Sequence, residues 1–186
     1  MTPQEVTPQE LADRAVAVLH AAGVADVTAA AAYSLVTVDV PRLRWEEAAS
    51  ALRDGLDLDS LEVVTAVDEE AAGFDVVVHV FSTTHKHGLA LRTRIPREDP
   101  SVTTLTGVWA GAAWHERHTA ELFGIGFAGH PGLTRLLLPD HVTTPLRKDV
   151  LLERRQTTPW PGRKEPGESE SDSPRRRRLL PPGVAP

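Results

Sequence analysis

Cysteine does not occur among the 186 residues of this chain. Its absence excludes disulfide bonds, iron–sulfur clusters held by cysteine, and a thiol nucleophile. The sequence also lacks an apolar run of about 18 residues, the length that a helix needs to cross a bilayer. Residues 1–9 are polar and do not form a basic start followed by an apolar stretch, so we expect no secretory signal. A cytoplasmic protein is the first expectation, and a peripheral place on a membrane complex stays open.

Motifs of common catalytic sites are missing as well. There is no Gly-x-Ser-x-Gly element, no dinucleotide fingerprint and no phosphate-binding loop. His115 and His118 stand one residue too close together for a His-Glu-x-x-His zinc motif. Glu116 and Glu121 are five residues apart and point away from each other on a helix, which disfavours a paired-carboxylate hydrolase. We therefore expect no catalytic residue, no bound cofactor and no metal in this chain.

The composition that remains is that of a soluble globular protein with a distinct tail. The hydrophobic fraction is 41 % and the formal charge is −6. After Gln156 the sequence becomes rich in proline, serine and acidic residues, and four arginines follow at 175–178. Such a segment cannot bury a core, so we predict a disordered tail over 157–186 and a flexible leader over 1–8. The arginines favour a solvated tail, and weak contact with a partner, an anionic lipid or nucleic acid is the alternative.

Hydrophobic periodicity predicts an α+β domain over residues 9–98. Gly55 is expected to cap the second helix, and residues 83–88 are expected to form a hairpin loop. The consecutive strands favour a mostly antiparallel sheet. The expected helices cover 9–22 and 44–54, and the expected strands cover 34–40, 60–67, 74–82 and 89–95.

A short helix is predicted over residues 112–123, and its apolar face contains a carboxylate. At about 100° per residue, Glu116 falls in the middle of the face formed by the alanines and Phe123. A buried, unpaired carboxylate costs several kcal/mol, so Glu116 needs a cation or an amide donor. One interpretation is a buried Glu–Arg pair, and the alternative is a Glu116 side chain that faces solvent. Arg117 and Glu121 are four residues apart and are expected to pair weakly.

The residues after this helix combine glycine, proline and charge. Gly124 is expected to cap the helix, and further glycines at 126, 129 and 132 permit tight turns. Arg147 and Lys148 lie beside Asp149. They are either part of a solvated turn or an anchor for a partner's carboxylate, which arginine contacts at two points. We predict that residues 99–156 form a signature helix and an extended partner-binding segment.

Several runs and single positions in this region stand in a characteristic order and spacing. These are Trp114-His115-Glu116-Arg117, Phe123-Gly124-Ile125, Phe127, Gly129-His130-Pro131, Leu133, Arg135 and Pro145-Leu146-Arg147-Lys148-Asp149. Together they resemble the C-type (30-kDa-type) subunit of respiratory complex I. The resemblance covers roughly residues 34–152. It departs from the family pattern at Ala110, His118, Ala120 and Glu121, where the family usually has proline, an acid, an aromatic residue and aspartate.

The resemblance implies a structural subunit in the hydrophilic arm of a proton-pumping NADH:quinone oxidoreductase. Its implied partners are the large, D-type, hydrogenase-like subunit and the adjacent iron–sulfur subunits. NADH, FMN, iron–sulfur clusters and quinone would belong to the complex and not to this chain. The implied place is the cytoplasmic face of the cell membrane, reached only through the complex. The implied interface residues are Trp114, Glu116, Arg117, Glu121, Phe123, Gly124, Gly129, His130, Pro131, Arg135, Pro145, Arg147, Lys148 and Asp149.

Two alternatives to this function stay open. One is the equivalent subunit of a related membrane-bound hydrogenase, or of a dehydrogenase that uses another electron donor. The other is an unrelated adaptor whose basic tail binds nucleic acid, although no nucleic acid is expected for a complex I subunit.

Overall fold

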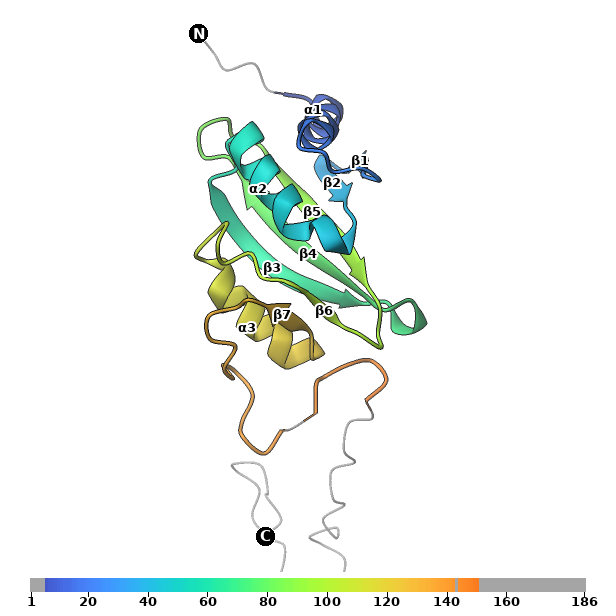
Figure 1. Cartoon of the computed structure of the whole chain (residues 1–186), viewed down its shortest axis with the longest axis vertical. Coiled ribbons are helices and arrows are strands. Elements are labelled where there is room, and N and C mark those ends of the chain that lie inside the picture. The colour runs from blue at the N-terminus through green and yellow to red at the C-terminus, as the bar shows by residue number, and fades with distance from the viewer. Residues whose placement is uncertain (1–5, 143, 151–186) are drawn as a thin grey trace, which may run out of the picture. The chain divides into compact units, whose positions relative to one another are not determined.

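The computed structural model describes residues 6–142 and 144–150 (Figure 1). They form an α+β fold, as the sequence predicts. The elements are α1 (Pro8–Ala21), β1 (Thr28–Ala32), β2 (Leu35–Asp39), α2 (Trp45–Leu56), β3 (Ser60–Asp68), β4 (Phe74–Phe81), β5 (Gly88–Ile95), β6 (Ser101–Thr103), α3 (Ala112–Phe123) and β7 (Gly126–Ala128), with short 3-10 turns at Arg42–Arg44 and Glu70–Ala72. The predicted tail, 157–186, lies outside the described residues.

Five strands form the main sheet in the order β1-β2-β5-β4-β3. Neighbouring strands are antiparallel except for β2 and β5, which are parallel; α2, β3 and β4 form the crossover connection that such a pair needs. The expected, mostly antiparallel sheet is therefore confirmed. A second, two-stranded sheet pairs β6 with β7 in parallel. The prediction from the sequence missed β1, β6 and β7: β1 is four-fifths alanine, which has a low preference for strands, and the other two have only three residues each.

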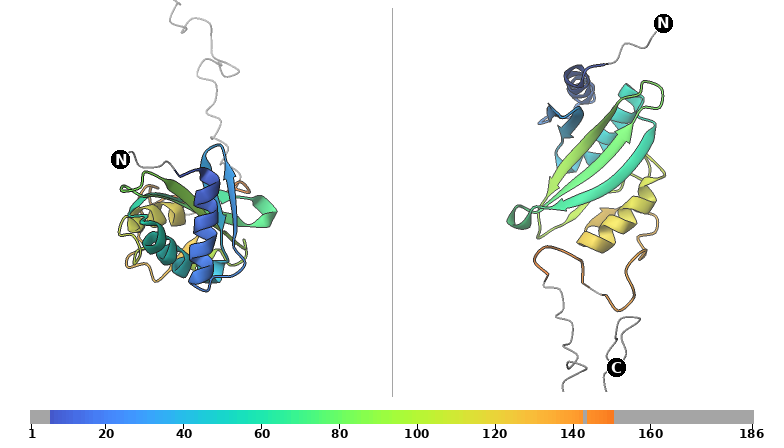
Figure 2. Two further views of the ribbon diagram at one scale, coloured as in Figure 1. Left: turned by 90° about the horizontal axis from the view of Figure 1, so that it is seen from above. Right: turned by 180° about the vertical axis from the view of Figure 1, so that it is seen from behind.

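One face of the main sheet packs against α1 and α2, and this layer forms the core. The buried positions of α2 recur three or four residues apart, so they share one face of the helix. In views from the front and from behind, α2 lies across one side of the sheet, and no helix among the residues drawn in colour covers the other side (Figure 2). The apolar core residues of the two helices are Leu11, Ala12, Ala15, Leu19, Trp45, Ala48, Ala49, Leu52 and Leu56.

The end of α2 differs from the prediction. The helix continues through Gly55 to Leu56, and its cap is Asp57, whose left-handed backbone has a φ of 52°. Gly55 serves a different purpose, because a Cβ atom at this position would lie 2.6 Å from Cγ1 of Val18 in α1. The glycine thus lets α1 and α2 approach each other closely, and it is not the helix cap.

Helix α3 covers the β3 edge of the sheet. The hydroxyl of Thr119 donates a hydrogen bond of 3.1 Å to the carbonyl oxygen of Val64 in β3. The edge is also interrupted by a register shift between Leu61 and Val63. This contact fixes α3, and with it the segment that follows, against the domain. Within the part of the chain that the structure describes, no helix is both long and apolar enough to cross a membrane.

Candidate partner-binding site

Glu116 is fully buried, as its place on the apolar face of the helix predicts. The Leu105 N–H donates to Oε1 over 2.6 Å, and the Thr104 hydroxyl donates to Oε2. The prediction of a buried Glu–Arg pair is therefore wrong, because the loop before α3 supplies an amide and a hydroxyl in place of a cation. Burial raises the pKa of Glu116, and the two donors and His130 only partly oppose this effect. Glu116 thus ties the β6–α3 connection to the helix.

The predicted pairing of Arg117 with Glu121 is wrong, because each side chain binds backbone groups of the segment that follows α3. Arg117 donates to the carbonyl oxygens of Thr134 and Arg135 over 2.9 and 2.8 Å. The Glu121 carboxylate accepts hydrogen bonds from three consecutive backbone N–H groups. These bonds lower the pKa of Glu121, and the one from the Leu137 N–H has the largest effect. The two side chains therefore bind the backbone of residues 134–138 and not each other. The three N–H donors belong to Leu136, Leu137 and Leu138, at 3.1, 2.7 and 2.8 Å.

His130 and Arg135 complete the path of this segment. The Gly132 N–H donates to Nδ1 of His130 over 3.0 Å, and Nε2 of the same ring lies 3.0 Å from the carbonyl oxygen of Ala113. Gly129, with a φ of 82°, allows the turn that brings His130 into this position. The Arg135 guanidinium binds the carbonyl oxygens of Pro139, Asp140 and Val142.

The C-terminal end of α3 is capped by Gly124 and by the side chain of Arg147. Gly124 has a φ of 68° and caps the helix, as the sequence predicts. Arg147 donates to the carbonyl oxygens of Phe123 and Gly124 over 2.6 and 3.3 Å. Its guanidinium also lies 5.0 Å from the ring centre of Phe74. Arg147 therefore binds carbonyl groups that have no partner within the helix. Its guanidinium is used inside the chain, so both earlier interpretations, a solvated charge and an anchor for a partner's carboxylate, are wrong for Arg147.

Asp68 holds the last described residues against the sheet. Its carboxylate is buried and accepts the Lys148 N–H over 3.0 Å and the Arg97 guanidinium over 2.7 Å. Burial alone would raise the pKa of Asp68, but the N–H groups of Lys148 and Glu70, together with Arg97, hold it below its ordinary value. Asp149 is more exposed, and its Oδ1 lies 3.9 Å from Nη1 of Arg97.

The prediction from the sequence did not assign a site role to Asp68, Phe74 or Arg97. Arg97 and Arg147 lie over the Phe74 ring, at 4.9 and 5.0 Å from its centre, and Phe123 meets the same ring edge-on. An acid at the end of a strand is the only local signal. The partners of these residues lie up to 80 positions away in the sequence, so local spacing does not show the contacts.

We predict that Arg147→Ala loosens residues 145–150 and lowers the free energy of unfolding by about 1–2 kcal/mol, because two carbonyl groups lose a charged donor. Arg147→Lys should recover less than half of the loss, since a single ammonium cannot reproduce the planar fork. Urea unfolding measures the loss of unfolding free energy, and amide exchange at residues 146–150 measures the loosening of the segment. Arg14→Ala, at an exposed position of α1, is the control. Equal losses in the Arg147 and Arg14 variants would contradict the capping role.

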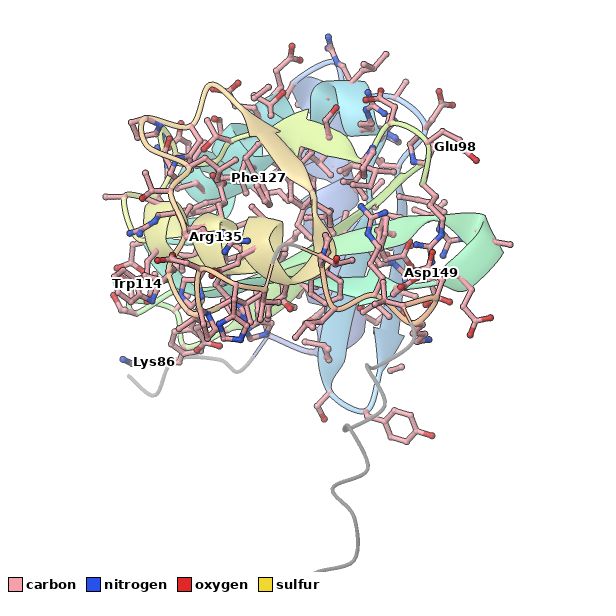
Figure 3. All side chains as sticks on the ribbon, turned by 90° about the horizontal axis from the view of Figure 1, so that it is seen from below. Lys86, Glu98, Trp114, Phe127, Arg135 and Asp149 are labelled. Atoms are coloured by element: carbon pink, nitrogen blue, oxygen red, sulfur yellow. The ribbon has the colours of Figure 1, made fainter. Side chains whose placement is uncertain are left out.

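Once these polar contacts are made, apolar side chains of α3 and of the segment after it remain exposed. Figure 3 shows one of them, Trp114, at the edge of the molecule. We call them the apolar rim: Trp114, Leu133, Leu137 and Leu146, which are 60 %, 42 %, 59 % and 49 % exposed. The guanidinium of Arg117 lies 5.7 Å from the Trp114 ring. A surface groove of about 360 Å³ runs between α3 and the segment and is lined by Leu133, Leu138 and Pro145 among others. The site is therefore an ordered backbone with outward-facing apolar groups.

Among residues 6–142 and 144–150, no group of three or more histidine, aspartate or glutamate side chains is arranged to hold a metal. A wider hollow of about 790 Å³ lies beside the end of α2, and it contains three aspartates. Each of them is engaged locally: Asp54 by Arg53, Asp57 by His85, and Asp59 by Thr83.

Comparison with known families agrees with the sequence pattern. The sequence model of the family described as the respiratory-chain NADH dehydrogenase 30 kDa subunit matches residues 38–156. The chain belongs to this family. The fold is also similar to that of a trypsin-resistant fragment of Nqo5, with a TM-score of 0.56 and 26 % identity over 64 % of this chain and 98 % of the fragment.

The relatives are named as C-type subunits of oxidoreductases. The NADH-quinone oxidoreductase C subunit of Citrifermentans bemidjiense is 37 % identical over 69 % of this chain and 81 % of the relative. The C subunit of the same enzyme from Roseiflexus sp. (strain RS-1) is 49 % identical, but that match spans 42 % of this chain and less than half, 46 %, of the relative. The F(420)H(2) dehydrogenase C subunit of Methanosarcina mazei is 37 % identical over 59 % of this chain and 72 % of the relative. The chain is thus similar to subunits of complexes that are named for different electron donors.

Proposed function

We propose that this chain is a structural and assembly subunit in the hydrophilic arm of a proton-translocating NADH:quinone oxidoreductase. In this role it holds the large hydrogenase-like subunit and the adjacent iron–sulfur subunits in register, so that electrons pass from NADH to quinone. The chain itself binds no cofactor and performs no reaction. NADH, FMN, the clusters and quinone are bound by other subunits, and the assembly lies at the cytoplasmic face of the membrane.

One observation carries the proposal: contacts with α3 organise the backbone of residues 132–142 and 144–150 and leave the side chains of the apolar rim exposed. Arg117, Glu121 and Arg147 bind backbone groups of this segment or of the helix end beside it, so their charges are used within the chain. A segment that is already ordered loses little conformational entropy when it docks. The exposed tryptophan and leucine side chains of the apolar rim supply apolar area that becomes buried on docking.

The charged residues of the family pattern then have an indirect part in docking. The surface is supported by three buried or partly buried side chains, Glu116, Glu121 and Arg147. Trp114 and Pro131 are exposed on it. Lys148 is also exposed, and its Nζ lies 3.9 Å from Oε1 of Glu70. We infer that the partner meets the apolar rim first and meets charges such as Lys148 at the periphery of the contact.

Gentle purification through a tag on the full chain tests the proposed function. We expect a large hydrogenase-like subunit and iron–sulfur subunits to co-purify in equal amounts, with NADH:quinone reductase activity in the eluate. Identification of every companion by mass spectrometry is the measurement. Recovery of the chain alone from gently solubilised membranes, or NADH turnover by the isolated chain, would contradict the proposal.

A second candidate function is the same structural role in a complex with another electron donor. The F(420)H(2) dehydrogenase relative favours it, since that protein shares 37 % identity with this chain. The same purification distinguishes the two candidates, because the companion that binds the donor identifies the complex.

A further inference from the structure

The outer edge of β1 is unusually open for the edge of a sheet. Among the described residues, β1 ends the strand order and has a hydrogen-bonded neighbour on one side only. It reads Thr-Ala-Ala-Ala-Ala, pairs with β2 in an unbroken register, and has four exposed residues out of five. Natural proteins usually blunt such edges with charges, proline, bulges or a covering element. The strand itself has no charge, no proline and no bulge.

The opposite edge of the same sheet, strand β3, is protected from pairing with another chain. Strand β3 has a register shift between Leu61 and Val63, and α3 lies against it with a hydrogen bond from Thr119 to the carbonyl oxygen of Val64. Helix α1 contacts β1 as well, but it belongs to the layer that covers one face of the sheet (Figure 2). Of the two edges of the main sheet, the β1 edge is therefore the open one among the described residues.

The hairpin geometry identifies the backbone groups that point outward. Tyr33 and Ser34 both have positive φ, at 49° and 67°, which is the pattern of a two-residue type I′ turn. In such a hairpin the residues that flank the turn, Ala32 and Leu35, exchange hydrogen bonds, and every second pair along the ladder does the same. The N–H and C=O groups of the intervening residues, Ala29 and Ala31, consequently point away from β2.

We propose that the β1 edge receives an extended segment of another polypeptide of the assembly, which adds to the sheet as a sixth strand. Unpaired N–H and C=O groups at strand spacing are complementary to another extended backbone, and the small alanine side chains leave room for it. Because β1 is uncharged, the added segment should be uncharged where it pairs. Tyr33 is fully exposed at the tip and Leu35 is 41 % exposed, so both flank the proposed contact.

A second copy of this chain fits the edge less well. Two folded domains joined only through five-residue edges would bury much less than the roughly 1,000 Å² that a stable interface needs. A segment that is already tethered within an assembly needs fewer contacts, because its local concentration is high. The inference thus rests on the proposed function. It also goes beyond the family likeness, since the family match begins at residue 38 and β1 precedes it.

Residue-resolved hydrogen–deuterium exchange on the full chain, free and in the assembly purified through its tag, tests the proposal. We expect exchange at the Ala29 and Ala31 amides to slow by at least about tenfold in the assembly, whereas the Ala30 and Ala32 amides, already bonded to β2, change little. This alternation is specific to strand pairing. Protection of all four amides alike, or of none, overturns the proposal.

A proline substitution provides the matching variant. Ala31→Pro removes one outward N–H and spares the β1–β2 ladder, as edge strands tolerate. In the assembly, this variant should lose the added protection at Ala29, whereas Ala31→Val should keep it. Unchanged protection at Ala29 in the proline variant overturns the proposal, as does a dimer of the free chain in sedimentation with the same alternating pattern. If companions co-purify and the edge stays unprotected, this inference fails and the proposed function stands. If no companion co-purifies, both fail.

Discussion

Replacing Glu116 with alanine should lower the free energy of unfolding by about 3 kcal/mol, which is the largest stability effect that we expect from a single polar side chain in this protein. The change leaves the buried Leu105 N–H without an acceptor and opens a cavity in a closed region. Urea unfolding at pH 7 is the measurement. Glu116→Gln is the matched control and should stay within about 1 kcal/mol of the wild type, since its amide can accept from Leu105 and donate to Thr104. Equal losses in the two variants would show that the charge, and not the shape and the hydrogen bonds, is what the site requires.

The difference in unfolding free energy between the wild type and Glu116→Gln should depend on pH. Because burial raises the pKa of Glu116 above its ordinary value of 4.5, the folded chain binds a proton more tightly than the unfolded chain. The resulting stability is fully present below pH 4.5 and is lost as the pH rises through the pKa of the folded state. The stability of the wild type relative to Glu116→Gln should therefore increase as the pH is lowered from 7 towards 4.5. A constant difference over this range would contradict a raised pKa. Asp68 acts in the opposite direction but is present in both proteins, so its contribution cancels.

Much of the fold could be predicted from the sequence because the signals are local. The alternation of Val76, Val78 and Val80 indicates a strand with one buried face, and the structure confirms it. The phase of the last helix placed Glu116 in the core correctly. Strand β1 was missed because four alanines favour a strand only when a neighbour supplies the pairing.

The contacts of the charged residues could not be predicted in the same way. A carboxylate on an apolar face requires a donor, but the sequence does not say whether that donor is a cation or a backbone N–H. The donors to Glu121 are backbone amides, and those to Glu116 are a backbone amide and the hydroxyl of Thr104. Every residue except proline offers a backbone amide, and no motif indicates which one is used. Arg147 is similar: its partners are carbonyl groups at the end of α3, so its residue type alone suggests a surface charge.

The largest effect on assembly should come from the apolar rim. Changing Trp114 and Leu137 together to glutamine should reduce the companion subunits recovered with the chain by at least about tenfold, because they are the two most exposed side chains of the apolar rim and tryptophan is prominent among the residues that dominate binding energy. Neither side chain donates or accepts a hydrogen bond in the described structure, and glutamine adds no charge next to Glu121. The isolated variant should therefore fold like the wild type, with its thermal midpoint unchanged to within about 2 °C. Leu43→Gln is the matched control, since Leu43 is 88 % exposed and lies outside the site.

Quantitative mass spectrometry of the companions recovered with the wild type, the Trp114/Leu137 double variant and Leu43→Gln is the decisive experiment for this surface. We predict full recovery of the hydrogenase-like and iron–sulfur subunits with the wild type and with Leu43→Gln, and loss of both with the double variant. Equal recovery with all three proteins, at equal thermal midpoints, would show that the surface held in place by α3 is not where this chain meets its partners.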